Sequence, residues 1–541
     1  MSLFPLLQLN DNKLLKQQQQ KSWQQFSQQH PQSYQALTAK QLEDFQCAIT
    51  LSDFVLTSAL QAPELVMELF VSKDVYRQST PPYANMLRDL LKDCQSEAQL
   101  HQLLRRFRLQ QMVNIAIADL VLNIKLEKSL ERLSLLADVL IQCSLDWLTS
   151  FCQSKWGTPT NAAGKTQPLL VYGMGKLGGK ELNFSSDIDL IFVYPHSGET
   201  QGCRRSLDNQ QFFTRLAQKL ITSLHQHTAD GFVYRVDMRL RPFGESGPLV
   251  LTFSAMEDYY QEQGRDWERY AMLKARVIPP LNSLQKTSLN ESDDHYHQEL
   301  SSLLRPFVYR RYIDFSVIES LRRMKNMISQ EVRRKQLVNN IKLGAGGIRE
   351  IEFIVQVFQL IRGGRVQELQ QRNLLTVLPE LVIANEMTED SKIVLENAYC
   401  FLRRVENILQ ALADKQTQTL PDNDLDKQRL LQVLGFDSWD NFTQVLAGHM
   451  NGVHEKFDQL IGIESPNIQA EDQQWSTLWQ SRWSDEESIA WLEQAQEQAP
   501  QNTVAWHSES VWHLLSDFRD DVGKRSIGSR GRQVLDKLIP Q

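Results

Sequence analysis

Residues 171–194 read VYGMGKLGGKELNFSSDIDLIFVY, and the fold expected for this chain depends on this stretch. Apart from Asp189, its last part, residues 188–194, is a continuous run of apolar and aromatic residues, which is typical of a buried strand. Asp187 and Asp189 stand at the start of that strand, one residue apart. Because alternate side chains of a strand point to the same face, the two carboxylates are expected to project together, about 7 Å apart.

Two carboxylates on one face repel each other and are costly to bury without a cation. A pair of Mg²⁺ ions would remove that cost and would also organise a phosphoryl or nucleotidyl transfer. A simpler alternative is that Asp187 and Asp189 only cap or solvate the end of the strand.

Two other phosphate-binding motifs are alternative interpretations of the same stretch. Residues 173–178 match the GxGxxG pattern of dinucleotide-binding proteins and follow an expected strand at residues 168–172. That fingerprint requires an acidic residue at the end of the second strand, whereas both aspartates stand at its beginning. A P-loop requires Ser or Thr after Gly-Lys, but Glu181 follows Lys180.

A third acid lies in a second segment of alternating character. Residues 231–242 place apolar side chains on one set of alternate positions, and Arg235, Asp237, Arg239 and Arg241 on the other. The alternation predicts a strand with one packed face. If this strand lies near the first, Asp237 completes a carboxylate triad, and the planar guanidinium groups suit phosphate oxygens. A salt-bridged surface strand is the alternative.

Four segments together resemble the bifunctional glutamine synthetase adenylyltransferase/adenylyl-removing family, within the DNA polymerase beta-like nucleotidyltransferase superfamily. The resemblance runs from about residue 40 to residue 465 and rests on specific motifs. These motifs are GMGKLGGKELNFSSDIDL at 173–190, VDMRLRPFGESGP at 236–248, DWERY at 266–270 and KLGAGGIREIEF at 342–353.

The resemblance implies an α+β, predominantly helical fold, in which a polymerase beta-like mixed sheet is flanked by N- and C-terminal helical regions. The expected division is a helical region at 1–150, a nucleotidyltransferase core at 151–300, a helical bundle at 301–463, and a linker with a partial helical segment at 464–541. One complete motif set is present, and it resembles the N-terminal, adenylyl-removing module of the family. We therefore expect the chain to be that half of a longer protein.

The activity implied by the resemblance is the phosphate-dependent removal of AMP from a tyrosine of glutamine synthetase, which gives ADP. Asp187, Asp189 and Asp237 are then the expected catalytic residues and ligands of two Mg²⁺ ions, with Mn²⁺ as a substitute. The expected phosphate-binding groups are those of Gly178, Gly179, Ser186, Arg239 and Arg241. Adenylyl transfer from ATP, the reverse direction, and a non-catalytic nucleotide-binding module remain as alternatives.

The resemblance also implies adenylylated glutamine synthetase and a PII-type signal protein as partners, glutamine as an effector, and a cytoplasmic location. The net charge of −7 argues against a general nucleic-acid binder. The sequence contains no uninterrupted apolar run of about 20 residues, so no membrane span is expected. The six cysteines include no CxxC pair, which is consistent with a reducing compartment.

Helical spacing extends over residues 38–151, over 207–225 between the expected strands, and over 348–361. The last helix follows the turn Gly344–Gly347, whose free N–H groups could bind an anion or whose glycines could allow close helix packing. Arg349, Glu350 and Glu352 are expected in the outer shell of the site.

Overall fold

The computed structural model forms two compact units, Met1–Asp458 and Gln459–Gln541. The residues that it describes are 12–77, 79–281, 295–310, 321, 323–328, 330–331, 334, 339–460, 484–497 and 507–524. The sequence also predicts a loop at 282–294 and helical spacing at 318–337. The loop, half of that helical stretch and the polar linker at 464–474 lie outside the described residues. The finer division into four segments stays a prediction.

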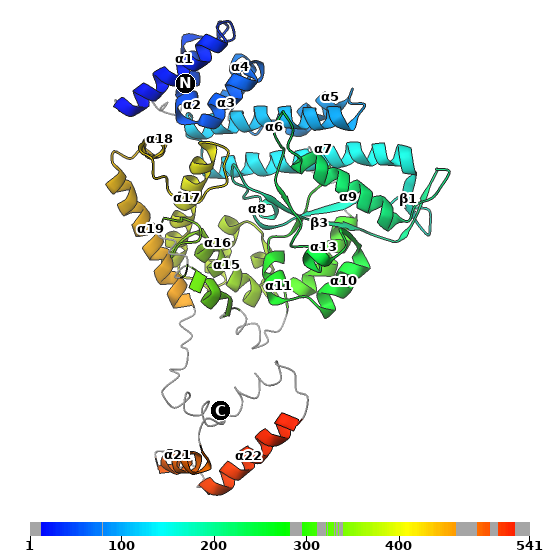
Figure 1. The fold of residues 1–541 in the computed structure, drawn as a ribbon, viewed down its shortest axis with the longest axis vertical. Coiled ribbons are helices and arrows are strands. Elements are labelled where there is room, and N and C mark those ends of the chain that lie inside the picture. The colour runs from blue at the N-terminus through cyan, green and yellow to red at the C-terminus, as the bar shows by residue number, and fades with distance from the viewer. Residues whose placement is uncertain are drawn as a thin grey trace. The chain divides into compact units, whose positions relative to one another are not determined.

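The first unit is predominantly helical with a small mixed sheet, so the α+β fold class is confirmed (Figure 1). Its N-terminal part is a set of helices ending in the long, neighbouring helices α6 and α7. These are α1 (Lys13–Gln29), α2 (Ala39–Leu51), α3 (Asp53–Gln61), α4 (Pro63–Val71), α5 (Tyr83–Leu91), α6 (Glu97–Leu120) and α7 (Leu126–Trp156), with a short 3-10 helix at Asp74–Tyr76.

The core of the sheet is β3 (Ile188–Tyr194), the strand expected from the apolar run. It pairs antiparallel with β2 (Leu170–Gly173), and parallel with β5 (Val236–Asp237) and β6 (Val250–Thr252). Because β3 has neighbours on both sides and is buried on both faces beyond Asp189, its sequence is continuously apolar rather than alternating. A further strand, β7 (Arg276–Val277), pairs with β2.

The remaining elements of this region surround the sheet. A separate two-stranded ladder joins β1 (Thr158–Asn161) to β4 (Gly198–Gln201). Helix α9 (Asn209–His225), expected at 207–225, begins with the side chain of Asp208 accepting a hydrogen bond from the Gln210 N–H. The other elements are α8 (Gly175–Gly178), α10 (Phe253–Glu262), α11 (Asp266–Met272), α13 (His295–Val308) and a 3-10 helix at Gly244–Ser246.

The strand expected at 231–242 is wrong in length, since only β5 forms within it. The side chain of Asp237 accepts a hydrogen bond from the Arg239 N–H, which bends the chain away from the sheet directly after β5. Pro242 then offers no N–H for a ladder, and Phe243 adopts a positive φ of 62°. The alternating pattern therefore continues into a turn.

Helices resume after the sheet. They are α15 (Ile348–Arg362), α16 (Leu374–Ile383), α17 (Glu389–Ala411), α18 (Asp424–Leu434) and α19 (Trp439–Leu460), with a 3-10 helix at Gln367–Gln370. Helix α17 packs against α6 and α7 as well as α15, α16 and α18, so segments far apart in sequence share one core with the sheet (Figure 1).

The second unit contains α21 (Asp485–Glu497) and α22 (Ser508–Lys524) among its described residues. Leu492 and Trp512 form a small buried cluster among these described residues, and the Trp512 indole Nε1 donates a 3.0 Å hydrogen bond to Asp485.

Among the described helices, α7 alone has by itself the length and composition of a membrane span, and the bent pair α3–α4 qualifies if it is counted as one span. In α7, 67% of the most apolar window is buried inside the protein. A core helix of a folded unit passes the same test.

Candidate active site

The three aspartates expected to form a triad lie at one point of the sheet. Asp189 on β3 is the register partner of Asp237 on β5, and Asp187 immediately precedes β3. In a parallel pair, register partners project from the same face, so the two strands bring the carboxylates together across 48 residues of sequence. The antiparallel pairing of β2 with β3 excludes a dinucleotide-binding βαβ unit, whose strands are parallel.

The carboxylate of Asp189 lies in a strongly negative environment. Burial, followed by the charges of Asp187 and Asp237, raises its pKa to about 6. The charges of Arg239 and Lys342 lower this pKa in turn, but they do not cancel the effect. The site therefore favours either a proton on Asp189 or a nearby cation.

The other two carboxylates have partners of their own. Arg239 forms a salt bridge with Asp237, donating from Nε to Oδ2 at 2.8 Å, and this bond lowers the pKa of Asp237. The Gln416 side chain donates a 2.7 Å hydrogen bond to Oδ1 of Asp187. Within the described residues, no three acidic, histidine or cysteine side chains already converge as a complete metal site.

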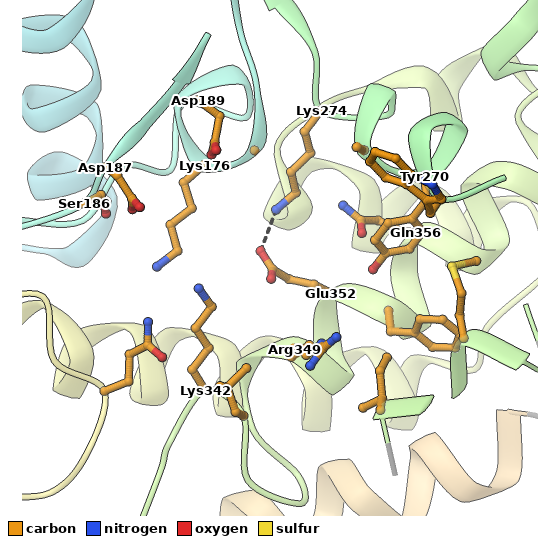
Figure 2. Close-up of a pocket in the computed structure, with 18 of the residues that line it drawn as sticks. Lys176, Ser186, Asp187, Asp189, Tyr270, Lys274, Lys342, Arg349, Glu352 and Gln356 are labelled. Carbon is orange, nitrogen blue, oxygen red and sulfur yellow. Dashed lines mark hydrogen bonds and ion pairs between the residues drawn. The ribbon is translucent and has the colours of Figure 1, made fainter. Parts of the chain in front are cut away.

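Asp187 and Asp189 line a cavity of about 710 Å³ (Figure 2). Its wall changes from acidic at the sheet, through a basic middle, to an apolar end. The residues of the basic middle are Lys176, Lys274, Lys342 and Arg349, and those of the apolar end are Trp267, Tyr270, Met324, Met327, Ile328 and Phe353.

Three of the four cations are paired with acids. Lys274 bonds to Glu181 at 2.8 Å and to Glu352 at 2.7 Å, and all three side chains are largely buried. Arg349 bonds to Glu331 at 2.7 Å. Lys176 bonds to Glu406 at 2.8 Å and to the Asn183 side chain at 2.8 Å.

Asp187 also lines a second, more open cavity of about 380 Å³, which we call the arginine groove. Its lining residues are Asp187, Arg235, Val236, Asp237, Met238, Arg239, Arg241 and Glu245. The Arg239 side chain is 72% exposed there. Asp187 thus lines both the main cavity and the more open arginine groove.

The residues predicted to bind phosphate have different surroundings. The N–H groups of Gly178 and Gly179 donate to the carbonyls of Met174 and Gly175, and neither glycine lines the main cavity or the arginine groove. A Cβ on Gly178 would lie 1.9 Å from the Lys274 carbonyl oxygen, so this glycine permits a close backbone approach. This geometry leaves the two glycines no free N–H group for a phosphate.

Ser186 and the two arginines do reach the cavities. Ser186 lines the main cavity, and its hydroxyl accepts a 3.2 Å hydrogen bond from the Asn183 N–H. Arg239 and Arg241 line the arginine groove. Arg241 donates to the carbonyls of Met238 and Glu245, so its guanidinium fixes the turn after β5.

The three residues expected in the outer shell of the site, Arg349, Glu350 and Glu352, also differ in whether they line a cavity. Arg349 and Glu352 line the main cavity. Glu350 instead accepts a hydrogen bond from the Gly346 N–H and pairs with His454. A Cβ on Gly346 would lie 1.8 Å from the Met450 carbonyl oxygen, so the glycine turn serves close helix packing rather than an anion.

One face of α17 fixes the loop that leads to the aspartates. The Asn407 side chain accepts from the Phe184 N–H at 2.9 Å, and the Gln410 side chain accepts from the Ser185 N–H at 3.0 Å. Arg403 donates to the Glu181 carbonyl and to the Asn183 side chain. These residues recur at helical spacing and are at most 1% exposed, so they form a buried polar support for the loop.

Several residues of the site were not identified from the sequence. Lys176 and Lys342 lie within the recognised motifs, but neither was assigned a role. Gln416 belongs to no motif, and it reaches Asp187 over 229 residues. Its polarity gave no signal, because glutamine is common on exposed surfaces.

Comparison with known protein families divides the first unit into two parts. Residues 42–291 match the family described as glutamate-ammonia ligase adenylyltransferase (GlnE). Residues 322–461 match the family described as GlnD PII-uridylyltransferase. The first match supports the resemblance found in the sequence, to a family of nucleotidyltransferases that act on glutamine synthetase, and the main cavity is lined by residues of both matched regions.

Proposed function

We propose that this chain removes AMP from an adenylylated tyrosine of glutamine synthetase, with inorganic phosphate as co-substrate and ADP as product. The match of residues 42–291 supports a nucleotidyltransferase acting on that enzyme. The motif set around Asp187 and Asp189 resembles the adenylyl-removing module of the family, and this resemblance supports the direction.

The observation that carries the proposal is the position of the carboxylates. Asp187, Asp189 and Asp237 lie at the parallel pair β3–β5, where Asp187 lines both the main cavity and the arginine groove, Asp189 lines the cavity and Asp237 lines the groove. A nucleotide in the cavity and a protein side chain in the groove would reach the carboxylates from opposite sides. The two simpler interpretations, a strand cap for Asp187 and Asp189 and a surface salt bridge for Asp237, give no reason for cavities beside these aspartates.

The three carboxylates fit Mg²⁺, with Mn²⁺ as the alternative. Their oxygens are the hard ligands that these ions prefer, and the raised pKa of Asp189 marks a place where a cation is favoured. When bound, such ions neutralise the carboxylates and the charge that develops on phosphoryl oxygens. To bind the metal, Asp237 would have to release its salt bridge with Arg239.

The cavity also fits an adenosine phosphate in size and lining. Its volume of about 710 Å³ falls in the range of small-molecule sites. Tyr270, Trp267 and Phe353 offer aromatic surface for a purine at the apolar end, and the basic middle lies between that end and the carboxylates.

The reaction balances without a strong general base. A phosphate oxygen forms a bond to the α-phosphorus, the bond from that phosphorus to the tyrosine oxygen breaks, and the phosphate proton ends on the tyrosine. A phenol ionises near pH ~10, so it leaves far more readily than an alkoxide. None of the described residues lining the main cavity is a histidine, which agrees with this chemistry.

The arginine groove is the proposed contact for glutamine synthetase. Its lining carries three arginines and three acidic residues, so it offers charges of both signs, and Phe243, which lies between Arg241 and Glu245 in the sequence, is 46% exposed. The match of residues 322–461 to a PII-uridylyltransferase family supports a PII-type protein as a regulator. Glutamine as an effector and a cytoplasmic location belong to the same proposal.

The test is to incubate the chain with adenylylated glutamine synthetase, Mg²⁺ and phosphate, and to measure ADP. We expect ADP that disappears when phosphate is omitted. Labelled AMP that instead passes from ATP to unmodified synthetase would establish the transfer direction, which the description of the first family names. Nucleotide binding without turnover in either direction, with and without a PII-type protein, would favour a non-catalytic module.

A further inference from the structure

Two lysine side chains point toward each other across the middle of the main cavity (Figure 2). Lys176 comes from α8, directly after β2. Lys342 comes from the turn before α15, more than 160 residues later. The former belongs to the region that matches the adenylyltransferase family and the latter to the region that matches the uridylyltransferase family.

Both lysines are held in place by their surroundings. The ammonium group of Lys176 is fixed by Glu406 and Asn183. The backbone N–H of Lys342 donates to the Asn340 side chain at 3.0 Å, and its carbonyl accepts from the Arg349 N–H at 3.0 Å. The turn and the first turn of α15 therefore determine where Lys342 can reach.

The charges around the two lysines are unequal. Lys274, Arg349 and Lys176 each have an acidic partner within 3.0 Å. Among the residues that the structure describes, no acidic side chain lies within 4.0 Å of the Lys342 ammonium group. Lys342 is thus the one of these four cations that makes no direct ion pair with a described acid, while its charge also helps to lower the pKa values of Glu352 and Glu406.

The proximity of the two ammonium groups has a measurable electrostatic consequence. Burial lowers the pKa of Lys176 to about 8, and the charges of Arg403 and Lys342 act in the same direction. The charge of Lys342 also lowers the pKa of the Asp189 carboxyl, and both lysines line the same cavity as Asp187 and Asp189. Two facing cations repel each other, and an anion between them would remove that repulsion.

We propose that Lys176 and Lys342 form a subsite for a phosphate group, next to the position where the α-phosphate of AMP meets Asp187 and Asp189. This proposal rests on the proposed function and deepens it. In the removal reaction the subsite holds the attacking inorganic phosphate, which becomes the β-phosphate of ADP. Because its two lysines come from different regions, a bound phosphate would also join the sheet to the turn before α15.

The subsite replaces the earlier expectation for phosphate binding. The N–H groups of Gly178 and Gly179 are occupied, and Arg239 and Arg241 line the groove rather than the cavity. Ammonium groups on flexible stems suit a phosphate that must enter, react and leave as part of ADP.

The test compares ADP with AMP, because only ADP carries the second phosphate. Calorimetric titration of the full chain in Mg²⁺ would give the affinity of each nucleotide and of inorganic phosphate. We expect Lys342→Gln to weaken ADP and phosphate by about 10- to 100-fold, the range for a hydrogen bond to a charged group, and AMP much less. Lys342→Arg should keep part of the preference for ADP over AMP. Lys392→Gln, on α17 outside the cavity, is the control and should keep all of that preference.

Equal loss of ADP and AMP affinity in Lys342→Gln, or no loss of either, would overturn the subsite. Lys176→Gln is a poorer first choice, because it leaves Glu406 buried without its partner. The binding test does not depend on turnover. If the unchanged protein binds ADP in preference to AMP through Lys342 but removes no AMP from glutamine synthetase, the proposed function alone is contradicted. If Lys342→Gln removes AMP with an unchanged KM for phosphate, the subsite alone is contradicted.

Discussion

The main cavity and the arginine groove share Asp187 but hold their cations in different ways. In the main cavity, Lys176 and Lys274 are buried and fixed by ion pairs with acids that are at most 17% exposed. In the groove, Arg239 is 72% exposed and paired with Asp237 from the same strand end. Buried and fixed charges suit a small ligand that is bound in one orientation, whereas exposed charges suit the surface of a protein. The comparison predicts effects of decreasing size.

The largest effect is expected at the carboxylates that the two cavities share. Asp189→Asn should lower the rate of AMP removal by three orders of magnitude or more, because a neutral side chain cannot hold a cation or balance its charge. A steady-state assay of ADP formation measures this effect. Asp440→Asn, an exposed change on α19, is the control and should leave the rate unchanged. An active Asp189→Asn protein would remove the carboxylate cluster from the mechanism.

The next effect concerns the fixed cations of the main cavity. Glu406→Gln leaves Lys176 and Arg403 without their buried acid, and we expect a loss of ~3–5 kcal/mol in the free energy of unfolding. Urea denaturation measures this loss. The matched control, Glu396→Gln, lies on the same helix in a more exposed pair with Lys392 and should cost less than ~1 kcal/mol. Equal losses would mean that burial does not distinguish the two pairs.

A smaller effect should appear in the dependence of stability on pH and metal. The pKa of Asp189 is raised from 3.8 to about 6 in the folded protein, so folding is favoured by its proton. That contribution is complete below pH ~4 and is lost as the pH rises through about 6. Without metal at pH 7.5, Asp189→Asn should therefore be more stable than the unchanged protein by ~1–3 kcal/mol.

Mg²⁺ should reverse this order of stability. The ion binds the ionised carboxylates of the folded, unchanged protein and so stabilises it, whereas it binds the asparagine variant weakly and adds little to its stability. Thermal unfolding with chelator and with Mg²⁺ would measure both arms. A variant stabilised by Mg²⁺ as strongly as the unchanged protein would show that the ion binds elsewhere.

The smallest effect is expected in the groove. Arg239→Ala should leave the free energy of unfolding nearly unchanged, since the guanidinium side of this ion pair is largely exposed to solvent. If the groove contacts glutamine synthetase, the same variant should raise the KM for the adenylylated enzyme several-fold and leave the affinity for ADP unchanged. Arg204→Ala, an exposed arginine that lines neither cavity, is the control. A change in ADP affinity would place Arg239 in the nucleotide site instead.

The elements that the sequence predicted well are those decided by local pattern. The strand at 188–194 and the helices near 207–225 and 348–361 have the expected ranges, within two residues. Their apolar spacing is set by which face packs, and a buried face leaves a regular trace in the sequence. The strand expected at 231–242 is shorter because the Asp237 side chain accepts a hydrogen bond from the Arg239 N–H and so forms a turn. Hydrophobic periodicity does not reveal such a local bond.

By itself, the sequence determined that Asp187 and Asp189 share a strand start, that a third aspartate follows near arginines, and that these motifs resemble a nucleotidyltransferase family. Only the tertiary structure decided which groups surround them. Gln416 meets Asp187, and Lys342 faces Lys176 (Figure 2), because α15 packs on α17 and α17 holds the loop that leads to β3. Such partners depend on the sum of many distant packing contacts, and no spacing in the chain encodes them, whereas strand and helix periodicity arises from residues only a few positions apart.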